Sequence, residues 1–122
     1  MTLDQFDTFC ASLKSTTHVV QWGGAHVWKV GGKVFAIGGW NDGAQPGITF
    51  KVSDIAFEIL KDQPGCRPAP YLAARGMKWI QNYAKPGLSD KELKDYIKTS
   101  HEIVGRGLSK KRQRELGLME SG

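Results

Sequence analysis

The chain has 122 residues, with 17 lysines and arginines against 12 aspartates and glutamates, and a formal net charge of +5 at pH 7. Its 40% hydrophobic and 24% charged residues are usual for a globular domain and exclude a disordered or fibrous chain. No run approaches the ~18–20 apolar residues of a membrane span, and Asp4 stands where a signal peptide carries a basic residue. We therefore expect one cytoplasmic domain without a membrane contact over residues 1–118, and a frayed tail over residues 119–122.

The cysteines and histidines offer no metal site that can be read from their spacing. Cys10 and Cys66 are far apart in the chain and form neither a disulfide framework nor a metal-binding knuckle. His18, His26 and His101 share no ligand spacing with each other or with either cysteine. We predict two free thiols, no bound metal and no cofactor.

The first predicted element is a helix. Thr2 and Gln5 have the spacing of a capping box, in which each side chain bonds a backbone N–H at the helix start. Apolar residues then recur every three or four positions from Leu3 to Leu13. The pattern predicts a helix from Leu3 to about residue 14.

Four strands are expected next, at residues 19–22, 25–30, 33–37 and 48–52. The second and third flank Gly31 and Gly32, and two glycines that accept positive φ favour a hairpin turn. The fourth run alternates apolar and polar residues, which predicts a sheet with one buried face. In this run Ile48, Phe50 and Val52 are expected to point inward, and Thr49 and Lys51 outward.

The second half of the chain is expected to be mainly helical. Ser53 is a natural N-cap for a helix whose core face would be Ile55, Ile59 and Leu60. After an irregular stretch at residues 66–77, a fifth strand is predicted at residues 78–83. A capping box at residues 89–92 opens a long helix, and a short helix follows at residues 110–116. The predicted fold is therefore α+β, in the order α-β-β-β-β-α-β-α-α, with about five antiparallel strands and helices packed on one face.

Three stretches, in this order, resemble the MmcQ/YjbR family. They are residues 27–36 (VWKVGGKVFA), residues 63–72 (QPGCRPAPYL) with Trp79 on the following strand, and residues 99–111, which begin Thr99-Ser100-His101. The resemblance implies a CyaY-like fold, related to frataxin and sometimes called a double-wing arrangement, and the DNA-binding role commonly given to the family. His101 stands where the family usually has a tyrosine.

Neither catalysis nor iron binding is indicated. Gly31-Gly32-Lys33 lacks the first glycine, the hydroxyl residue and the following helix of a phosphate-binding loop. No nucleophile elbow or comparable signature brings a serine or cysteine to a base. A frataxin-like iron site would need an acidic ridge on the first helix, where only Asp4 and Asp7 are found. We expect a protein that is not an enzyme.

The basic residues suggest nucleic acid as a partner. They fall into a hairpin pair, a group around the Pro-rich segment, and a C-terminal stretch without an acid between residues 106 and 114. We predict a monomeric module that binds the phosphates of duplex DNA with low sequence specificity. The residues assigned to this contact are Lys29, Lys33, Arg67, Arg75, Lys78, Arg106, Lys110, Lys111, Arg112 and Arg114.

The alternative is a domain that binds a protein or a small ligand. Four tryptophans occur in this chain, and the sequence favours a core position for Trp28 and Trp79 on their strands. Trp40, in a glycine-rich loop, is the best candidate for an exposed aromatic residue. In this alternative the Trp40 loop and the Pro-rich segment line a groove. One continuous positive face would favour DNA, and a concave aromatic pocket would favour the ligand.

Overall fold

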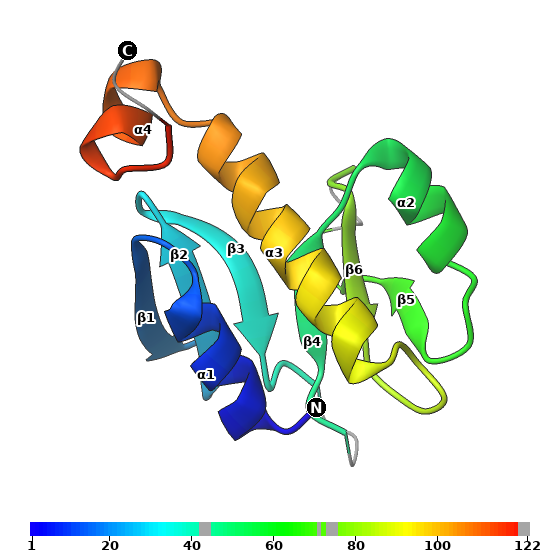
Figure 1. The fold of residues 1–122 in the computed structure, drawn as a ribbon. Helices are drawn as coiled ribbons and strands as arrows, with labels where there is room; N and C mark the ends of the chain where they lie inside the picture. The colour runs from blue at the N-terminus through cyan, green and yellow to red at the C-terminus, as the bar shows by residue number, and fades with distance from the viewer. Residues whose placement is uncertain (42–44, 71, 73–75, 120–122) are drawn as a thin grey trace.

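The computed structural model describes residues 1–41, 45–70, 72 and 76–119. Its elements form an open sheet with helices across one face (Figure 1). The strand order is β1-β2-β3-β4-β6-β5, and all neighbours pair antiparallel. The elements are α1 (Leu3–Ser12), β1 (Thr16–Gln21), β2 (Ala25–Val30), β3 (Lys33–Gly38), β4 (Ile48–Lys51), α2 (Asp54–Leu60), β5 (Cys66–Pro68), β6 (Trp79–Asn82), α3 (Asp90–Arg106) and α4 (Lys110–Glu115). The predicted α+β class and the meander β1 to β4 are confirmed.

The helix starts follow the predicted caps. Thr2 and Gln5 form a capping box on α1, and Ser89 and Glu92 form a second one on α3. Ser53 and Ser109 cap α2 and α4 through their side-chain oxygens. Short polar side chains at these positions satisfy N–H groups that have no partner within the helix.

The sheet has six strands, one more than predicted. The additional strand, β5, pairs with β6 at the edge of the sheet. It lies in the stretch expected to be irregular because Pro68 and Pro70 argue against a strand. Proline is tolerated there because an edge strand leaves one side of its backbone without a partner.

The main core lies between the helices and the front face of the sheet, which we define as the face covered by α1 and α3. Side chains from α1, α3 and the central strands are fully enclosed there, among them Phe6, Phe35, Phe50, Ile80, Leu93 and Ile97. Trp28 and Trp79 are 7% and 4% exposed, so both core predictions are confirmed. Cys10 and Cys66 are free and buried.

A second, smaller cluster covers the opposite face, which we call the back face. Ala25, Val27 and Ile37 are buried there, and Trp40 and Leu72 pack against them. The prediction that only one face is buried is wrong for the centre of the sheet. Thr49, expected to point to solvent, is on this face and has no exposed surface.

The predicted core face of α2 is wrong for two of its three residues. Leu60 is 1% exposed, but Ile55 and Ile59 are 77% and 61% exposed. Ile55 and Ile59 are four residues apart and share one side of the helix, whereas Leu60 is about 100° further round. The helix has seven residues and packs beside the short strands β5 and β6, which can cover only one side of it.

Within the described residues, no helix is both long and apolar enough to cross a membrane.

Candidate functional site

The hairpin turn and the C-terminal helix meet at one end of the molecule. A Cβ atom on Gly31 would come within 2.5 Å of Leu108 Cδ1 and 3.2 Å of Leu116 Cδ1. The Ser15 hydroxyl donates a hydrogen bond of 2.5 Å to the Leu116 carbonyl. Figure 1 shows α4 next to the turn between β2 and β3. Two stretches that are far apart in the chain are thus joined by direct contact.

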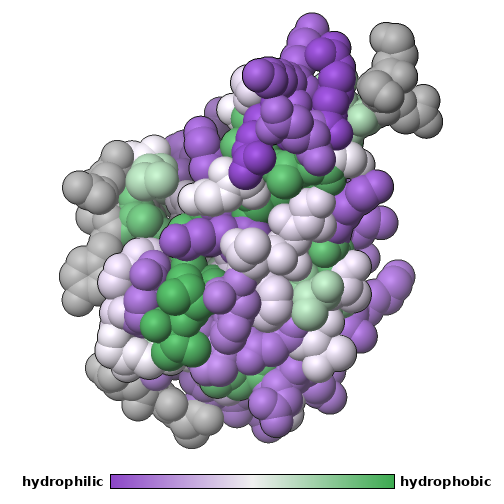
Figure 2. All heavy atoms as spheres, turned by 90° about the vertical axis from the view of Figure 1, so that its left-hand side faces the viewer, coloured by the Kyte–Doolittle hydropathy of each residue, from purple (hydrophilic) through white to green (hydrophobic). Residues whose placement is uncertain are grey.

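This contact gathers six of the predicted basic residues into what we call the basic end: Lys33, Arg106, Lys110, Lys111, Arg112 and Arg114. All six are exposed. Among the ion pairs of the described residues, only Arg112 of this group has a carboxylate partner, Glu115 at 3.4 Å. Figure 2 shows hydrophilic atoms gathered at the top of the molecule, where α4 lies. The basic end therefore presents positive charge to solvent.

The remaining predicted residues do not join this group. Lys29 is half-buried on β2, opposite Thr17 and Val34 in the sheet. The Lys78 ammonium lies 4.8 Å from the centre of the Phe57 ring on α2. Arg75 lies outside the described residues.

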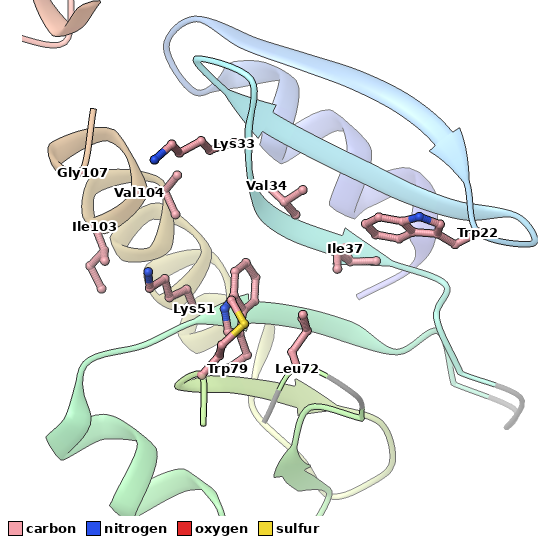
Figure 3. Close-up of a pocket in the computed structure, with 11 residues that line it drawn as sticks. Trp22, Lys33, Val34, Ile37, Lys51, Leu72, Trp79, Ile103, Val104 and Gly107 are labelled. Atoms are coloured by element: carbon pink, nitrogen blue, oxygen red, sulfur yellow. The ribbon is translucent and has the colours of Figure 1, made fainter. Parts of the chain in front are cut away.

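A pocket between β3, β4 and the C-terminal end of α3 adjoins the basic end (Figure 3). Its volume is about 380 Å³. Lys33 and Lys51 reach toward it from β3 and β4, while Trp22 lies on its far side. The Trp79 indole also lines it, and its buried Nε1 has no hydrogen-bond partner among the described residues. The pocket combines an apolar lining with two cationic side chains.

The exposed tryptophan is not the predicted one. Trp40 is half-buried and packs against the cluster of Ala25, Val27 and Ile37. Trp22, at the end of β1, is 52% exposed and has a positive φ of 54°. The two indoles contact each other with ring centres 5.7 Å apart. A positive φ outside glycine is not visible in a propensity pattern, so no sequence signal marks the change of backbone direction at Trp22.

Arg67, on β5, lies at the opposite end of the back face in a second pocket, of about 590 Å³. Its guanidinium donates two hydrogen bonds to Gln81 Oε1, of 3.0 and 2.8 Å. The Asn41 side-chain oxygen accepts a further one at 3.5 Å. Arg67 and Lys78 do not converge, because Arg67 pairs with Gln81 on β6, whereas Lys78 precedes β6 and lies over the Phe57 ring.

A cluster of Asp7, His18 and His26 was missed by spacing arguments. One ligand-type atom from each residue lies within 4.8 Å of the others. The Asp7 carboxylate already accepts a hydrogen bond from Trp28 Nε1 at 2.9 Å and contacts His26 Nδ1 at 2.7 Å. These hydrogen bonds give the cluster a structural role, as a clamp that links α1 to β2. Only the pairing of β1 with β2 brings His18 beside them.

His101 has a structural position within α3. It is 8% exposed, and its Nε2 lies 2.7 Å from the Lys14 carbonyl. Its ring meets Phe35 edge-on at 5.1 Å. The side chain therefore links α3 to β3 and to the segment that follows α1.

The structure is thus an α+β domain with an open antiparallel sheet, backed by helices and carrying a basic end and a pocketed back face. A family model described as YjbR matches residues 11–103. The chain belongs to the YjbR family.

One solved structure shows the same fold. The crystal structure of the Deinococcus radiodurans protein DR2400, with a DUF419 domain, superposes with a TM-score of 0.83 at 20% sequence identity. The match covers 99% of this chain and 91% of that one. No curated protein matches. At this identity the likeness concerns the fold, and function has to be argued from the residues.

Proposed function

We propose that this protein is a non-enzymatic nucleic-acid-binding module that contacts duplex DNA phosphates through its basic end. The observation that carries the proposal is the contact of Gly31 with Leu108 and Leu116. It places Lys33, beside the hairpin turn, next to the basic residues of α4. In this proposal the β2–β3 hairpin acts as a wing, and α4 supplies further charge beside it.

The charges at this end favour an anionic partner. Lys33, Lys110, Lys111 and Arg114 are exposed, and within the described part of the chain none of them forms an ion pair with a carboxylate. Lys110 and Lys111 also lie in the first turn of α4, which has no acidic residue. Positive charge is unfavourable at a helix N-terminus, and a phosphate beside these residues would relieve that repulsion.

The surface chemistry also limits the kind of recognition. Lysine and arginine contacts to phosphates fix the position of a protein on DNA but carry no direct sequence information. The short α4, with six residues, offers exposed lysines and arginines rather than a row of groups that read base edges. We therefore expect similar affinity for duplexes of different sequence.

The test is a salt titration with a mixed-sequence duplex, followed by fluorescence anisotropy. We expect a Kd of about 10⁻⁴–10⁻⁶ M near physiological salt, weakening linearly with log salt. A triple substitution, Lys110→Ala, Lys111→Ala and Arg114→Ala, should weaken every duplex equally. Each lost phosphate contact should reduce the slope of log K against log salt by ~0.9.

The matched control changes three exposed lysines near the start of α3: Lys85→Ala, Lys91→Ala and Lys94→Ala. It alters the net charge by the same amount but leaves the basic end intact. The control should retain the slope of the unmodified protein. Equal losses of DNA affinity in the two triple variants would show that binding depends only on net charge. Absence of salt-dependent binding at 50 mM salt would overturn the proposal.

A further inference from the structure

We propose that the second back-face pocket, around Arg67, binds a small aromatic monocarboxylate. This site is separate from the basic end. Trp22 and Gly23, which line it, precede β2, whereas the Gly31 turn follows β2. Its occupancy is therefore independent of the nucleic-acid proposal above.

The first argument is that Arg67 is held in one orientation. Gln81 accepts from both its Nε and Nη2 atoms, and the Arg67 guanidinium carbon lies 4.3 Å from the centre of the Tyr83 ring. Gln81 is itself fixed, because its Nε2 donates 2.6 Å to the Trp40 carbonyl and it has no exposed surface. A binding group that is already ordered loses little conformational entropy when a ligand arrives.

The second argument is that this fixed charge has no counter-ion among the described residues. Its hydrogen-bond acceptors are the neutral amide oxygens of Gln81 and Asn41. None of the ion pairs in the described residues includes Arg67, although the residue is half-buried. A partly desolvated guanidinium without a carboxylate is costly, and an anionic ligand group would compensate it.

The number of unused donors indicates the size of the anion. Nε and Nη2 already donate to Gln81, which leaves the Nη1 group facing no protein acceptor among the hydrogen bonds of the described residues. Nη2 also donates to Asn41, so the one remaining donor group, Nη1, and one positive charge match a carboxylate. A phosphate dianion usually draws on several cationic or backbone donors.

The side chains that line the pocket indicate that the same ligand carries an aromatic ring. Trp22 and Trp40 line it as adjoining indoles, with planes tilted by 32°, and Pro70 lines it as well. Indole faces give large contact areas to flat rings. The volume of about 590 Å³ lies within the usual range for small-molecule sites.

The experiment uses three probes: 2-naphthoate, its neutral amide 2-naphthamide, and acetate. Binding is followed in ¹H–¹⁵N NMR spectra through the four indole N–H signals, assigned by single substitutions. We expect 2-naphthoate to shift the Trp22 and Trp40 signals with a Kd of at most ~1 mM, and both the amide and acetate to bind about tenfold more weakly or worse. Acetate retains the charge without the ring, and the amide retains the ring without the charge.

Two substitutions separate the charge from the wall. Arg67→Gln should remove the preference for 2-naphthoate over the amide, while Trp22→Ala should weaken both ring-bearing probes. Trp22 is half exposed, so the second variant tests the pocket even if Arg67→Gln disturbs folding. Arg106→Gln, which removes an exposed charge at the basic end, is the control and should bind 2-naphthoate normally.

Equal affinity for the acid and the amide would overturn the proposal, as would normal 2-naphthoate binding by a folded Arg67→Gln variant. Shifts confined to Trp28 or Trp79 would also contradict it, because those indoles do not line this pocket. Arg67→Gln should leave the salt dependence of DNA binding unchanged. Failure of one proposal is thereby distinguished from failure of the other.

Discussion

Gly31 and Leu108 lie in direct contact, although one belongs to the β2–β3 turn and the other follows the long helix α3. A Cβ atom on Gly31 would approach Leu108 Cδ1 to 2.5 Å. A larger residue at position 31 would have to displace the Leu108 side chain. It also fixes the distance between the hairpin and α4, on which the proposed DNA-binding surface depends.

The first prediction follows from this contact. Gly31→Ala should lower the free energy of unfolding by about 1–3 kcal/mol more than Gly32→Ala, because the added methyl group must displace Leu108 and Leu116. Both glycines have positive φ, 59° and 82°, so the strain of a side chain in that conformation is common to the two variants. A Cβ on Gly32 would meet nothing within 4 Å.

Urea denaturation of the two variants measures this difference. Gly31→Ala should also weaken duplex DNA binding, since it moves the hairpin lysine away from α4. If the two variants were equally stable, the packing of the turn against Leu108 would not be a constraint on the fold.

The second prediction concerns the clamp between α1 and β2. Asp7→Ala should lower the free energy of unfolding by about 1–3 kcal/mol, because it leaves the nearly buried Trp28 indole N–H without its acceptor. Asp4→Ala, at an exposed position in the first turn of the same helix, should cost less than ~1 kcal/mol through the helix dipole alone. Chemical denaturation, with near-UV circular dichroism to follow Trp28, compares the two.

The outcome against this prediction is an Asp7→Ala variant as stable as Asp4→Ala. In that case the hydrogen bonds from Trp28 and His26 would add nothing to the packing of α1 on the sheet.

The third prediction concerns the buried thiols and alkaline pH. Burial raises the pKa of Cys66 to about 11 and raises the pKa of Cys10 further, whereas an unfolded cysteine titrates near ~8.5. The unfolded chain therefore releases thiol protons that the folded chain keeps. Stability from this source is complete below pH ~8.5 and is lost as pH rises toward about 11.

Urea denaturation at pH 7, 8.5 and 10 tests this sign. Cys66→Ala removes one titrating thiol, so its stability should fall less steeply with pH than that of the unmodified protein. The gap between the two proteins should narrow as pH rises, and a constant gap would contradict the prediction. The intact mass under non-reducing conditions should show two free thiols.

The two proposed sites are formed by different residues and differ in chemistry. The basic end offers exposed lysines and arginines that suit a phosphate backbone. The Arg67 pocket offers one ordered guanidinium and two indoles that suit a small planar anion. The substitutions above allow DNA binding and small-ligand binding to be measured separately.

The sequence by itself determined the local structure. Capping residues such as Thr2 and Ser89 and the glycine turn at 31–32 depend on neighbours within a few positions, and the structure confirms each. Such patterns can be read because backbone geometry ties residue type to position over short distances.

Tertiary structure decided which distant residues meet. Strand pairing brought Gln81 to Arg67 and His18 to Asp7, and turn packing brought Gly31 to Leu108; spacing in the chain signalled none of these. The same applies to Thr49, Ile55 and Ile59, whose exposure depends on what covers each face of the sheet. Burial and contact are properties of the assembled layers, so a local pattern can indicate that a side chain faces one way without showing what lies there.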